Sequence, residues 1–359
     1  MSVEQYAGPD AASSVAAEHR LLAAPDEFDF GHRRVTLAHL PTPIEPLDRL
    51  AQMLGLPAGR LFAKRDDATG LALGGNKVRK LEYLCADALA SGARHLVTAG
   101  LGQSNHCRQT AAAAAKLGLG CTVLLVGPPP DTFTGNLVLD VLYGADIRWI
   151  DSADRTTIVD DLDAAIHAEA ERLTAAGTPA YPVVVGGSVP LGALGYVRAG
   201  RELQAQFPDL ARVFCPSGSF GTHAGLVVGL GDHDLVQGVQ IGVGGRDHPE
   251  ERIERLAADT AALAGLPSPR GRARLDSRHG HATQTEAILE AIRLAARTEG
   301  LVLDPVYTGT VMAGLIAAGR EGALPVDGDI VFLHTGGGPG LLGAEHAEWL
   351  VDALAGADS

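Results

Sequence analysis

Lys77 follows two glycines and an asparagine in the stretch LALGGNKVRKLEYL. If Asn76 is the N-cap of a helix, a rotation of 100° per residue places Lys77 on one face with four small or apolar side chains. These are Leu81, Leu84, Cys85 and Ala88. Arg79 and Glu82 point away from that face, and Lys80 falls outside it. The pattern predicts a lysine amine at the buried N-terminus of a helix.

An amine in that position is favoured in its neutral form. Burial disfavours the charged ammonium, and the positive end of the helix dipole disfavours it further. A neutral lysine amine is a nucleophile that forms a Schiff base with an aldehyde, which arginine cannot do. The chain has only four lysines among its 29 basic residues, at positions 64, 77, 80 and 116. A lysine whose stem packs on the core while its head reaches water is the alternative interpretation.

A second stretch that could do chemistry is the glycine-rich turn in CPSGSFGTHAGLVVGL, residues 215–230. It lies between an apolar strand pattern and an apolar helix pattern, so its N–H groups and hydroxyls gather at a helix N-terminus, which suits a phosphate. The residues concerned are Ser217, Gly218, Ser219, Gly221 and Thr222. The turn is neither a P-loop nor a GxGxxG dinucleotide turn, and a plain strand-to-helix turn is the alternative.

The stretch TAGLGQSNHCRQTAAAAAKLG, residues 98–118, repeats this design with Ser104 and Asn105 at the start of another helix. Its N-terminal amides are placed to hold a carboxylate, unless Ser104 or Asn105 only caps the helix. A lysine for an aldehyde, one turn for a phosphate and one for a carboxylate together predict a pyridoxal-phosphate site that acts on amino acids.

Alternating strands and helices must position these residues. Short apolar runs predict buried strands at 95–100, 121–127, 146–150, 181–187, 212–217, 236–243 and 329–337. Helical patterns fall between them at 109–117, 159–175, 193–206 and 251–264. The alternation predicts an α/β protein whose parallel sheets are covered by helices on both faces.

The clearest helix pattern covers residues 284–299 and leads into LVLDPVYTGTVMAGL. Apolar residues recur on one of its faces, at Ile288, Ile292, Ala295 and Ala296. Thr283 and Glu286 have the spacing of a capping box, and Gly300 supplies the stop.

Composition narrows the class of partner. The 359 residues, 46% of them hydrophobic, are enough for one large or two ordinary domains. A formal charge of −14 and a pI near 5.3 argue against nucleic acid or an anionic membrane as the main partner. The four cysteines show neither CxxC pairing nor metal-ligand spacing, so we expect them to be reduced and buried, and we expect no metal site.

The first thirty residues carry acidic side chains where a signal peptide needs a basic start and an apolar run, and no long uncharged apolar span follows. We therefore expect a cytoplasmic protein in which residues 1–30 form a loosely held extension.

Seven motifs in order, between residues 39 and 345, resemble the family of D-cysteine desulfhydrase and 1-aminocyclopropane-1-carboxylate (ACC) deaminase. They are LPTPIEPLDRL, KRDDATGLALGGNKVRKLEYL, QSNHCRQTAAAAAKLGL, GGSVPLGALGYV, SGSFGTHAGL, LVLDPVYTG and HTGGGPGLLG. These relatives are pyridoxal-phosphate enzymes of fold type II, similar to the tryptophan synthase β subunit. The resemblance implies two open parallel-sheet α/β domains and a homodimer. A large cofactor domain would comprise residues 1–80 and 191–359, and an inserted small domain, residues 81–190, would carry the carboxylate loop.

The resemblance also implies roles for single residues. Lys77 would bind the cofactor and later shuttle the Cα proton of the substrate, and Asn105 would hydrogen-bond the ring oxygen of the cofactor. Ser104, Asn105 and His106 would hold the substrate carboxylate. The cofactor phosphate would lie on the second turn, at Ser217, Gly218, Ser219, Gly221 and Thr222.

Thr308 would face the pyridine nitrogen in this resemblance, and Tyr307 would lie against the substrate. ACC deaminases typically have glutamate after the tyrosine, and its charge keeps the ring protonated. Threonine lacks that charge, so we expect a neutral ring nitrogen. The resulting weaker electron sink favours β-elimination of a good leaving group over the opening of a cyclopropane.

Two positions depart from the family pattern. His279, in RHGHAT, stands where relatives have a second tyrosine, and Thr310 stands where they commonly have lysine. In one hypothesis Arg278, His279 and His281 form a pocket for an anionic leaving group, such as the sulfonate of cysteate. In another, His279 is the general acid for a thiolate. A solvated loop that happens to be basic is the alternative.

The sequence thus predicts a lyase that eliminates the β substituent of a small amino acid, with D-cysteine as the first choice and pyruvate, sulfide and ammonia as products. L-Cysteate or another small amino acid is the alternative substrate, and ACC is a weaker one. A non-enzymatic binding module is the alternative from another class. An NAD-binding oxidoreductase is disfavoured because GLGQSN lacks the last glycine of the dinucleotide turn and no suitable acidic residue follows.

Overall fold

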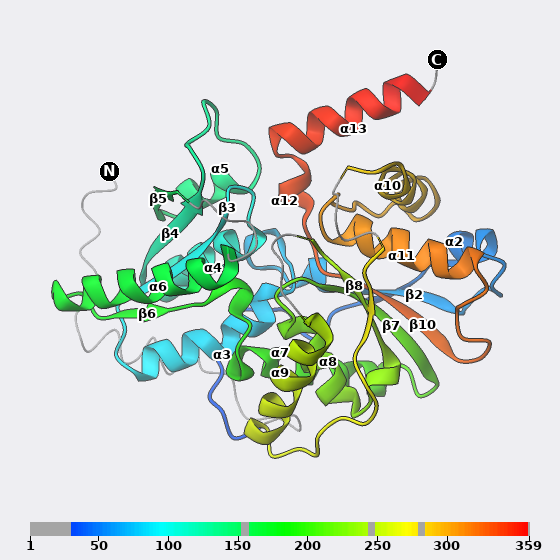
Figure 1. The fold of residues 1–359 in the computed structure, drawn as a ribbon, viewed down its shortest axis with the longest axis horizontal. Helices are drawn as coiled ribbons and strands as arrows, with labels where there is room; N and C mark the ends of the chain where they lie inside the picture. The colour runs from blue at the N-terminus through cyan, green and yellow to red at the C-terminus, as the bar shows by residue number, and fades with distance from the viewer. Residues whose placement is uncertain (1–29, 152–157, 243–247, 279–283, 358–359) are drawn as a thin grey trace.

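Two separate sheets organise the molecule (Figure 1). The structure is a computed structural model that describes residues 30–151, 158–242, 248–278 and 284–357. A six-stranded sheet has the order β1-β2-β10-β7-β8-β9 and a four-stranded sheet the order β5-β4-β3-β6. Every neighbouring pair is parallel except β1 with β2. The α/β class with parallel sheets is therefore confirmed.

The strands of the six-stranded sheet are β1 (Ile44–Pro46), β2 (Leu61–Arg65), β7 (Leu210–Ser217), β8 (Val236–Gln240), β9 (Arg274–Asp276) and β10 (Asp329–His334). Those of the four-stranded sheet are β3 (His95–Leu101), β4 (Gly120–Val126), β5 (Asp146–Ile150) and β6 (Ala180–Pro182).

The helices are α2 (Asp48–Met53), α3 (Lys77–Ala90), α4 (Asn105–Leu117), α5 (Asn136–Leu142), α6 (Ile158–Ala175), α7 (Pro190–Gln206), α8 (Gly221–Leu230), α9 (Pro249–Leu263), α10 (Glu286–Glu299), α11 (Thr308–Arg320), α12 (Gly338–Leu341) and α13 (Ala344–Ala357). In Figure 1, α13 extends from the body beside α12.

Both faces of each sheet are covered, as the continuous apolar strands predict. On β10, Ile330 and Phe332 pack against α2, α10 and α11, whereas Val331 and Leu333 pack against α7, α8 and α9. On β4, Val123 and Leu125 face α3, α4 and α5, while Leu124 faces α6. Successive side chains of a strand point to opposite faces, so a strand between two helical layers must be apolar throughout.

The predicted strands and helices differ from the structure where the sequence pattern is short or mixed. The predicted strand 181–187 ends at Pro182, and residues 185–187 form a 3₁₀ turn instead. The short strands β1 and β9 and the partly charged β2 lack a long apolar run and were not predicted. The helix α10 begins at Glu286, later than predicted, and its N-cap Thr285 accepts from the N–H of Ile288; the predicted capping residue Thr283 lies outside the described residues. Gly300 ends the helix in the left-handed conformation as expected.

We propose that the domains divide near the predicted positions 80 and 190, because all strands of the smaller sheet lie between residues 95 and 182 and all strands of the larger sheet lie outside that range. Position 80 falls inside α3, so a helix and not a flexible linker joins the two parts.

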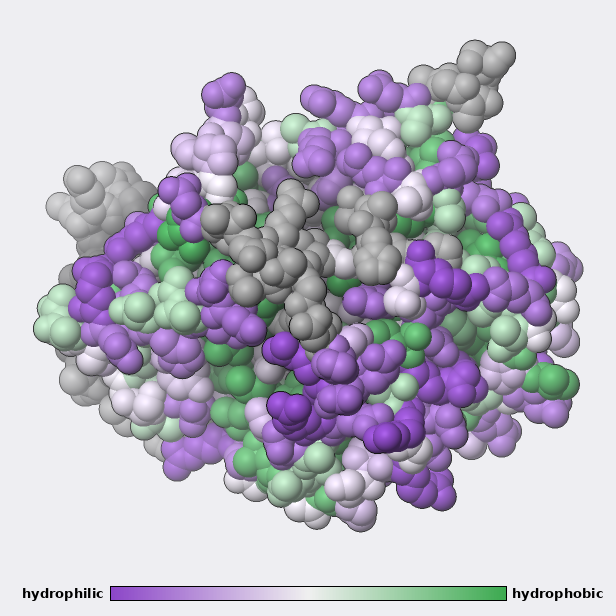
Figure 2. All heavy atoms as spheres, in the orientation of Figure 1, coloured by the Kyte–Doolittle hydropathy of each residue, from purple (hydrophilic) through white to green (hydrophobic). Residues whose placement is uncertain are grey.

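The face of the molecule in Figure 2 shows polar side chains over most of its described surface, with smaller apolar areas between them. None of the helices in the described residues is long and apolar enough to cross a membrane. All four cysteines are free and buried, as predicted. The N-terminal extension lies outside the described residues.

Candidate active site

The loop before Lys77 is locked in place by backbone hydrogen bonds. The N–H of Gly75 donates to the hydroxyl of Thr69, at 2.8 Å, and to the carbonyl of Asp66, at 3.0 Å. A Cβ atom on Gly74, at a φ of +73°, would lie 1.7 Å from the carbonyl oxygen of Asp67, and one on Gly75 would lie 2.5 Å from a side-chain amide of α4. Only glycine fits both positions, which explains the two glycines before the lysine.

The amine of Lys77 lies in a partly buried position at the first residue of α3. Its Nζ donates to Oδ1 of Asn76 at 3.0 Å and lies 5.9 Å from the ring centroid of Tyr307. Burial and the nearby charge of Arg108 lower the pKa of Lys77 to about 8, although Asp304 opposes the shift. A sizeable neutral fraction therefore exists near neutral pH, as a nucleophilic amine requires.

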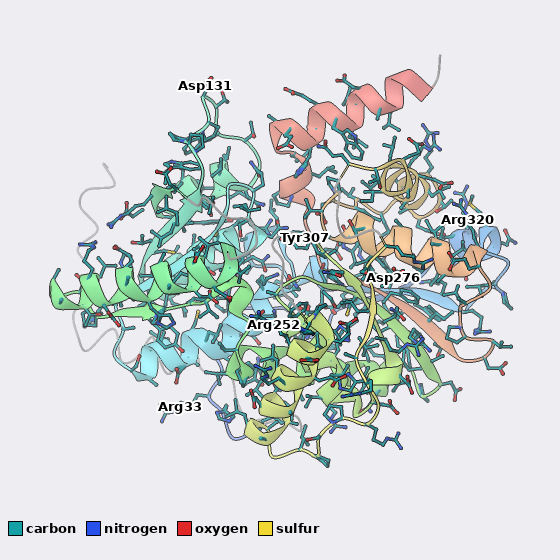
Figure 3. The ribbon with its side chains drawn as sticks, viewed as in Figure 1. Arg33, Asp131, Arg252, Asp276, Tyr307 and Arg320 are labelled. Carbon is teal, nitrogen blue, oxygen red and sulfur yellow. The ribbon has the colours of Figure 1, made fainter. Side chains whose placement is uncertain are left out.

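Tyr307 comes from the N-terminus of α11 and lies near the centre of the molecule in Figure 3, between the two sheets. Burial raises the pKa of its phenol to about 12, so this side chain stays protonated at ordinary pH. It is thus available as a hydroxyl donor beside Lys77.

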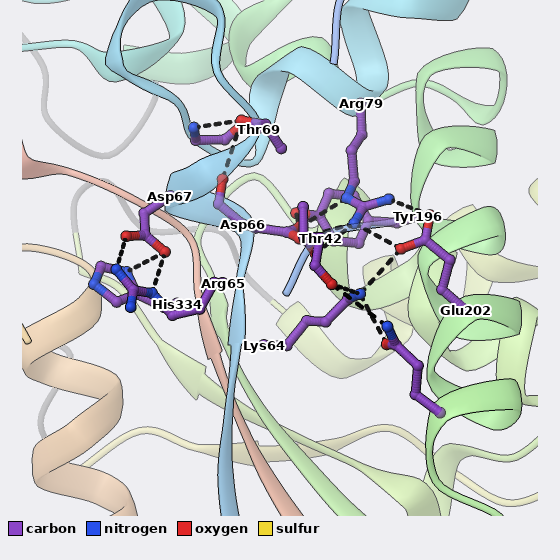
Figure 4. Close-up of polar contacts among 12 residues, drawn as sticks. Thr42, Lys64, Arg65, Asp66, Asp67, Thr69, Arg79, Tyr196, Glu202 and His334 are labelled. Carbon is purple, nitrogen blue, oxygen red and sulfur yellow. Dashed lines mark hydrogen bonds and ion pairs between the residues drawn. The ribbon is translucent and has the colours of Figure 1, made fainter. Parts of the chain in front are cut away.

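The helix α3 differs from the predicted amphipathic helix, because all residues from Val78 to Ala86 are buried. Arg79 and Glu82 do not point to solvent. Arg79 forms ion pairs with Asp66 at 2.9 Å and with Glu202 at 2.8 Å (Figure 4). Buried charges are tolerated when they are paired, and a sequence pattern based on hydropathy alone misses this.

Asn76 precedes α3 as predicted, but its side chain does not cap the helix. It accepts from Lys77 and donates from Nδ2 to the hydroxyl of Thr222, at 3.1 Å. Thr222 is the second residue of α8, in the glycine-rich turn that opens this helix. A continuous chain of hydrogen bonds therefore joins the lysine to the turn for which the sequence predicts a phosphate.

The glycine-rich turn follows the carboxyl end of β7 and opens α8. The hydroxyl of Ser188 donates to Oγ of Ser219 at 2.7 Å and accepts from the N–H of Gly221 at 3.3 Å. Ser217 is fully buried, and its hydroxyl is hydrogen-bonded to Nδ1 of His223 at 2.7 Å. Gly218 has an open Cβ position, with no atom nearer than 3.6 Å. The turn therefore offers mainly backbone groups at a helix N-terminus.

Lys80 lies at this turn, although the sequence placed it outside the reactive face. Its Nζ donates to the carbonyl of Gly186 at 3.0 Å and to Ser188 at 3.3 Å. A Cβ atom on Gly221 would lie only 2.9 Å from this amine. The only sequence signal is the spacing KVRK, which places Lys80 one helical turn after Lys77.

The second turn follows the carboxyl end of β3 and opens α4. Ser104 is its N-cap, and its Oγ accepts from the N–H of Cys107 at 3.2 Å, which leaves the hydroxyl proton available. The backbone N–H groups of Asn105 and His106 are in the first turn, where helical N–H groups lack an intrahelical acceptor. Ser104 as a cap and the turn as an anion site are thus compatible.

The ring of His106 does not serve as a charged hydrogen-bond donor. Thr98 donates its hydroxyl to the carbonyl of Val183, so it accepts from Nε2 of His106 at 2.9 Å. Burial and the nearby amines of Lys77 and Lys80 lower the pKa of His106 to about 3. The ring is neutral and presents Nδ1 as an acceptor, so any donation from this residue to a carboxylate would come from its backbone N–H.

Contacts of α4 with α3 and the loop before it hold the turn of α4 beside the lysine. Oε1 of Gln109 accepts the N–H of Val78 at 3.0 Å and so replaces the missing N-cap of α3. Nη2 of Arg108 donates to the carbonyl of Gly74 at 2.8 Å.

Thr308 is held by a carboxylate that sequence reasoning missed. Its Oγ1 donates to Oδ1 of Asp304 at 2.7 Å and accepts from the N–H of Asp304 at 2.8 Å. The other oxygen, Oδ2, accepts the N–H groups of Val306 and Tyr307. The sequence feature that could have predicted this contact is the four-residue spacing in DPVYT, which suits a carboxylate that caps the first turn of α11.

His279 and His281 lie outside the described residues. Arg278, beside them, is half-exposed and paired with Asp276 at 2.8 Å and Glu321 at 2.6 Å. Its charge is therefore already balanced, which weakens the hypothesis of a cationic pocket that includes Arg278.

The observed groups fit pyridoxal phosphate. An amine with a lowered pKa suits its aldehyde, and the first turn of α8 together with Lys80 suits its phosphate. The first turn of α4 would then remain for the substrate carboxylate. Within the described residues, no group of acidic, histidine and cysteine side chains is arranged to hold a metal ion.

Comparison with known proteins agrees with this chemistry. The sequence profile of the family described as "Pyridoxal-phosphate dependent enzyme" matches residues 35–336. The D-cysteine desulfhydrase of Salmonella newport (strain SL254) is 42% identical over 321 residues, which cover 86% of this chain and 95% of that protein. The protein of the same name from Salmonella typhi is equally similar.

Solved structures show the same fold. The crystal structure of an ACC deaminase homologue has a TM-score of 0.78 and 33% sequence identity, and covers 92% of this chain and 99% of that one. The processed form of threonine deaminase isoform 2 from Solanum lycopersicum has a TM-score of 0.58 at 17% identity, with 92% of this chain and 90% of that chain covered. The second likeness concerns the fold alone.

Proposed function

The chain belongs to the family of pyridoxal-phosphate-dependent enzymes of fold type II, and from this premise we propose that it removes sulfide from D-cysteine by β-elimination. The enzyme is a pyridoxal-phosphate-dependent lyase. When bound, the cofactor supplies an aldehyde that combines with amines and a ring that withdraws electrons from the adjacent carbon.

Lys77 would hold the cofactor and then move the proton of the substrate. Its Nζ, with a pKa of about 8, is neutral often enough to accept the Cα proton and basic enough to keep it. The side-chain oxygen Oδ1 of Asn76 accepts from the amine, and Nδ2 of Asn76 in turn donates to the hydroxyl of Thr222. These two hydrogen bonds, which join Lys77 to the turn proposed for the phosphate, are the observation that supports the reaction class.

The phosphate of the cofactor would lie on the turn formed by Ser217, Gly218, Ser219, Gly221 and Thr222. The helix N-terminus supplies N–H donors and a partial positive charge. Lys80 would add a full positive charge, because its amine lies beside Gly221.

The substrate carboxylate would lie on the first turn of α4. Ser104 would donate its hydroxyl proton, and Asn105 and His106 their backbone N–H groups. Tyr307 would lie on the opposite side of Lys77, where its phenol contacts the substrate. We also propose that His279 protonates the departing sulfur.

The overall reaction consumes D-cysteine and one water and gives pyruvate, hydrogen sulfide and ammonia. The Cα–H and Cβ–S bonds break, the departing sulfide takes up a proton, and hydrolysis of the remaining enamine releases ammonia. The substrate rests on similarity to proteins named D-cysteine desulfhydrase and on Thr308 in place of a glutamate.

A substrate screen tests this proposal. The purified enzyme, loaded with pyridoxal phosphate, is incubated with D-cysteine, L-cysteate or ACC, and the products are measured by mass. We expect pyruvate and sulfide from D-cysteine. Reaction of L-cysteate alone would favour the sulfonate alternative, and formation of 2-oxobutyrate from ACC alone would contradict the proposal.

A homodimer in the cytoplasm completes the proposal. Three exposed apolar side chains at helical spacing on α5, Val138, Val141 and Leu142, support a protein contact there. Sedimentation of the purified enzyme tests the dimer, and a monomer at micromolar concentration would contradict it.

A further inference from the structure

We propose that Asn136 is a positioning residue that turns the side-chain amide of Asn105 so that its NH₂ group donates into the active site. The inference rests on the proposed function, because it concerns the residue expected to bind the ring oxygen of the cofactor. It goes beyond it in assigning the orientation of that amide to a residue of another helix, α5.

Hydrogen bonds to backbone groups fix the orientation of the side-chain amides of Gln103 and Asn136. Nε2 of Gln103 donates to the carbonyl of Thr134 at 3.0 Å, and Oε1 of Gln103 accepts the backbone N–H of Asn136 at 2.9 Å. Nδ2 of Asn136 then donates to the carbonyl of Gln103, at 2.8 Å. A carbonyl can only accept and an N–H can only donate, so neither amide can be reversed without a loss of hydrogen bonds.

A further hydrogen bond from Asn136 fixes the orientation of the side-chain amide of Asn105. The same Nδ2 of Asn136 donates to Oδ1 of Asn105 at 3.0 Å. Because Oδ1 of Asn105 is used in this way, its Nδ2 points to the other side. No described residue accepts from this Nδ2, so its two N–H groups are offered to an acceptor that the described chain does not provide.

The position of Asn105 favours an anionic oxygen as that acceptor. Asn105 is the first residue of α4, at the turn where two backbone N–H groups also lack an intrahelical partner. Its Oδ1 lies 3.8 Å from the Cβ position of Gly340, so the glycine-rich segment before α13 encloses the same turn. A neutral amide donor beside unpaired N–H groups suits a phenolate or carboxylate oxygen.

The segment before α5 also contacts the residues around α12. The hydroxyl of Thr134 accepts the N–H of Ala344 at 3.0 Å, and a Cβ atom on Gly135 would lie 2.6 Å from the carbonyl of Pro339. Asn136 itself is fully buried, and its Oδ1 has no partner among the described residues. An apolar residue would avoid this buried, unpaired oxygen, so the side chain is better explained by its two donated hydrogen bonds.

Two variants of Asn136 test the proposal. In Asn136→Asp the carboxylate can only accept, so Asn105 must turn its NH₂ group toward it and away from the site. In Asn136→Leu no hydrogen bond fixes the amide of Asn105. The variant Asn105→Asp removes the donor directly. Thr134→Val is the matched control, because it removes a hydrogen bond of the same loop but leaves the hydrogen bonds among Gln103, Asn136 and Asn105 intact.

The first readout is the visible absorption of the bound cofactor as a function of pH. We expect Asn136→Asp to shift the spectrum in the same direction as Asn105→Asp, the double variant to add nothing further, and Thr134→Val to match the natural enzyme. We expect the spectrum of Asn136→Leu to lie between those of the natural enzyme and Asn136→Asp. The second readout is kcat/KM, which should fall by about 10- to 100-fold in Asn136→Asp, as for a lost hydrogen bond to a charged group.

The outcomes separate the two proposals. If the natural enzyme binds no pyridoxal phosphate, the proposed function fails. If it binds the cofactor and turns over substrate, but both variants of Asn136 keep the natural spectrum and kinetics, the positioning role of Asn136 is overturned. Should Asn136→Asp fail to fold, the spectrum of Asn136→Leu decides by the same criterion.

Discussion

Arg79 and Arg108 are both almost fully buried, yet their surroundings differ completely. All three guanidinium nitrogens of Arg79 donate, to Asp66, Glu202 and Thr42. Arg108 donates only from Nη2, to the carbonyl of Gly74, and its Nε and Nη1 have no partner among the described residues. The first region has complete pairing of charge, and the second does not.

The paired region holds the scaffold. Lys64 joins it through an ion pair with Glu202 at 3.1 Å, and the phenol of Tyr196 donates to Asp66 (Figure 4). Burial by itself would raise the pKa of Asp66, but the charge of Arg79 holds it below the usual value. The cluster ties together β2, α3 and α7, which set the position of Lys77.

The unpaired region adjoins the turn proposed for the substrate. Besides Arg108, both oxygens of Asp140 and Nδ1 of His106 lack partners among the described residues. Such groups destabilise a fold, and they persist where function uses them. We infer that the paired charges hold the scaffold, and we propose that the unpaired Arg108 beside α4 acts on the chemistry of Lys77.

Replacement of Lys77 by alanine gives the largest expected effect on activity. Because no other amine lies at that position, we expect the initial rate of elimination to fall by at least about 10⁴-fold. Thermal stability without cofactor should change little. The exposed Lys116 supplies the matched control, Lys116→Ala, which should keep full activity; a Lys77→Ala enzyme with more than a hundredth of the natural rate would contradict the assignment.

Replacement of Arg79 by methionine should give the largest loss of stability. It leaves Asp66 and Glu202 as buried carboxylates without their main partner, at a cost of about 3–5 kcal/mol in the free energy of unfolding. Urea denaturation measures this value. Arg148→Met, which breaks half-exposed ion pairs on β5, is the control and should cost under about 1 kcal/mol. Equal losses in the two variants would remove the distinction between the regions.

Replacement of Asp140 by asparagine tests the unpaired region through the pH dependence of stability. Burial raises the pKa of Asp140 to about 7, although Arg108 opposes the shift. The folded state therefore binds a proton that the unfolded state releases above its own, lower pKa, so the natural protein loses stability as pH rises through the range from about 4 to 7. An asparagine side chain at this position has no such proton to lose.

We thus expect the stability of the Asp140→Asn variant, relative to the natural protein, to increase by about 2–4 kcal/mol between pH 4 and pH 8. Urea titrations at several pH values measure the difference. A difference that stays constant would show that folding does not raise the pKa of Asp140, and one that grows toward acid pH would show that folding lowers it.

Replacement of Arg108 by methionine should have a smaller effect, on the acid limb of the pH–rate profile. The positive charge of Arg108 lowers the pKa of Lys77, so its removal raises that pKa, and a higher pH is needed to obtain the neutral amine. The acid limb of the rate at which the cofactor-free protein attaches pyridoxal phosphate should move to higher pH. A limb that does not move, or that moves to lower pH, would separate Arg108 from the chemistry of Lys77.

Much of the site follows from local sequence. Lys77 and the two turns carry strong signals, because glycines, hydroxyls and a helix start are features of a few consecutive residues. The central strands were likewise predicted, since burial between two helical layers requires continuous apolar runs. The fold class and cofactor could therefore be predicted before any coordinates.

The rest depends on contacts between distant segments. Lys80 reaches the turn of α8 only because α3 packs beside α7, and Gln109 caps α3 only because α4 crosses it. Asn76 was predicted as the N-cap and stands at that position, but its side chain is hydrogen-bonded to Lys77 and Thr222 instead of capping the helix. No pattern within one element reports such pairings, so Asp304 and Asn136 were also missed.

Attachment of the cofactor tests the central claim most directly. The purified protein is incubated with pyridoxal phosphate, reduced with borohydride and digested, and the modified peptide is identified by mass. We expect one phosphopyridoxyl group, on Lys77. Modification of Lys80 or another lysine instead, or a protein that stays colourless and unmodified, would contradict it.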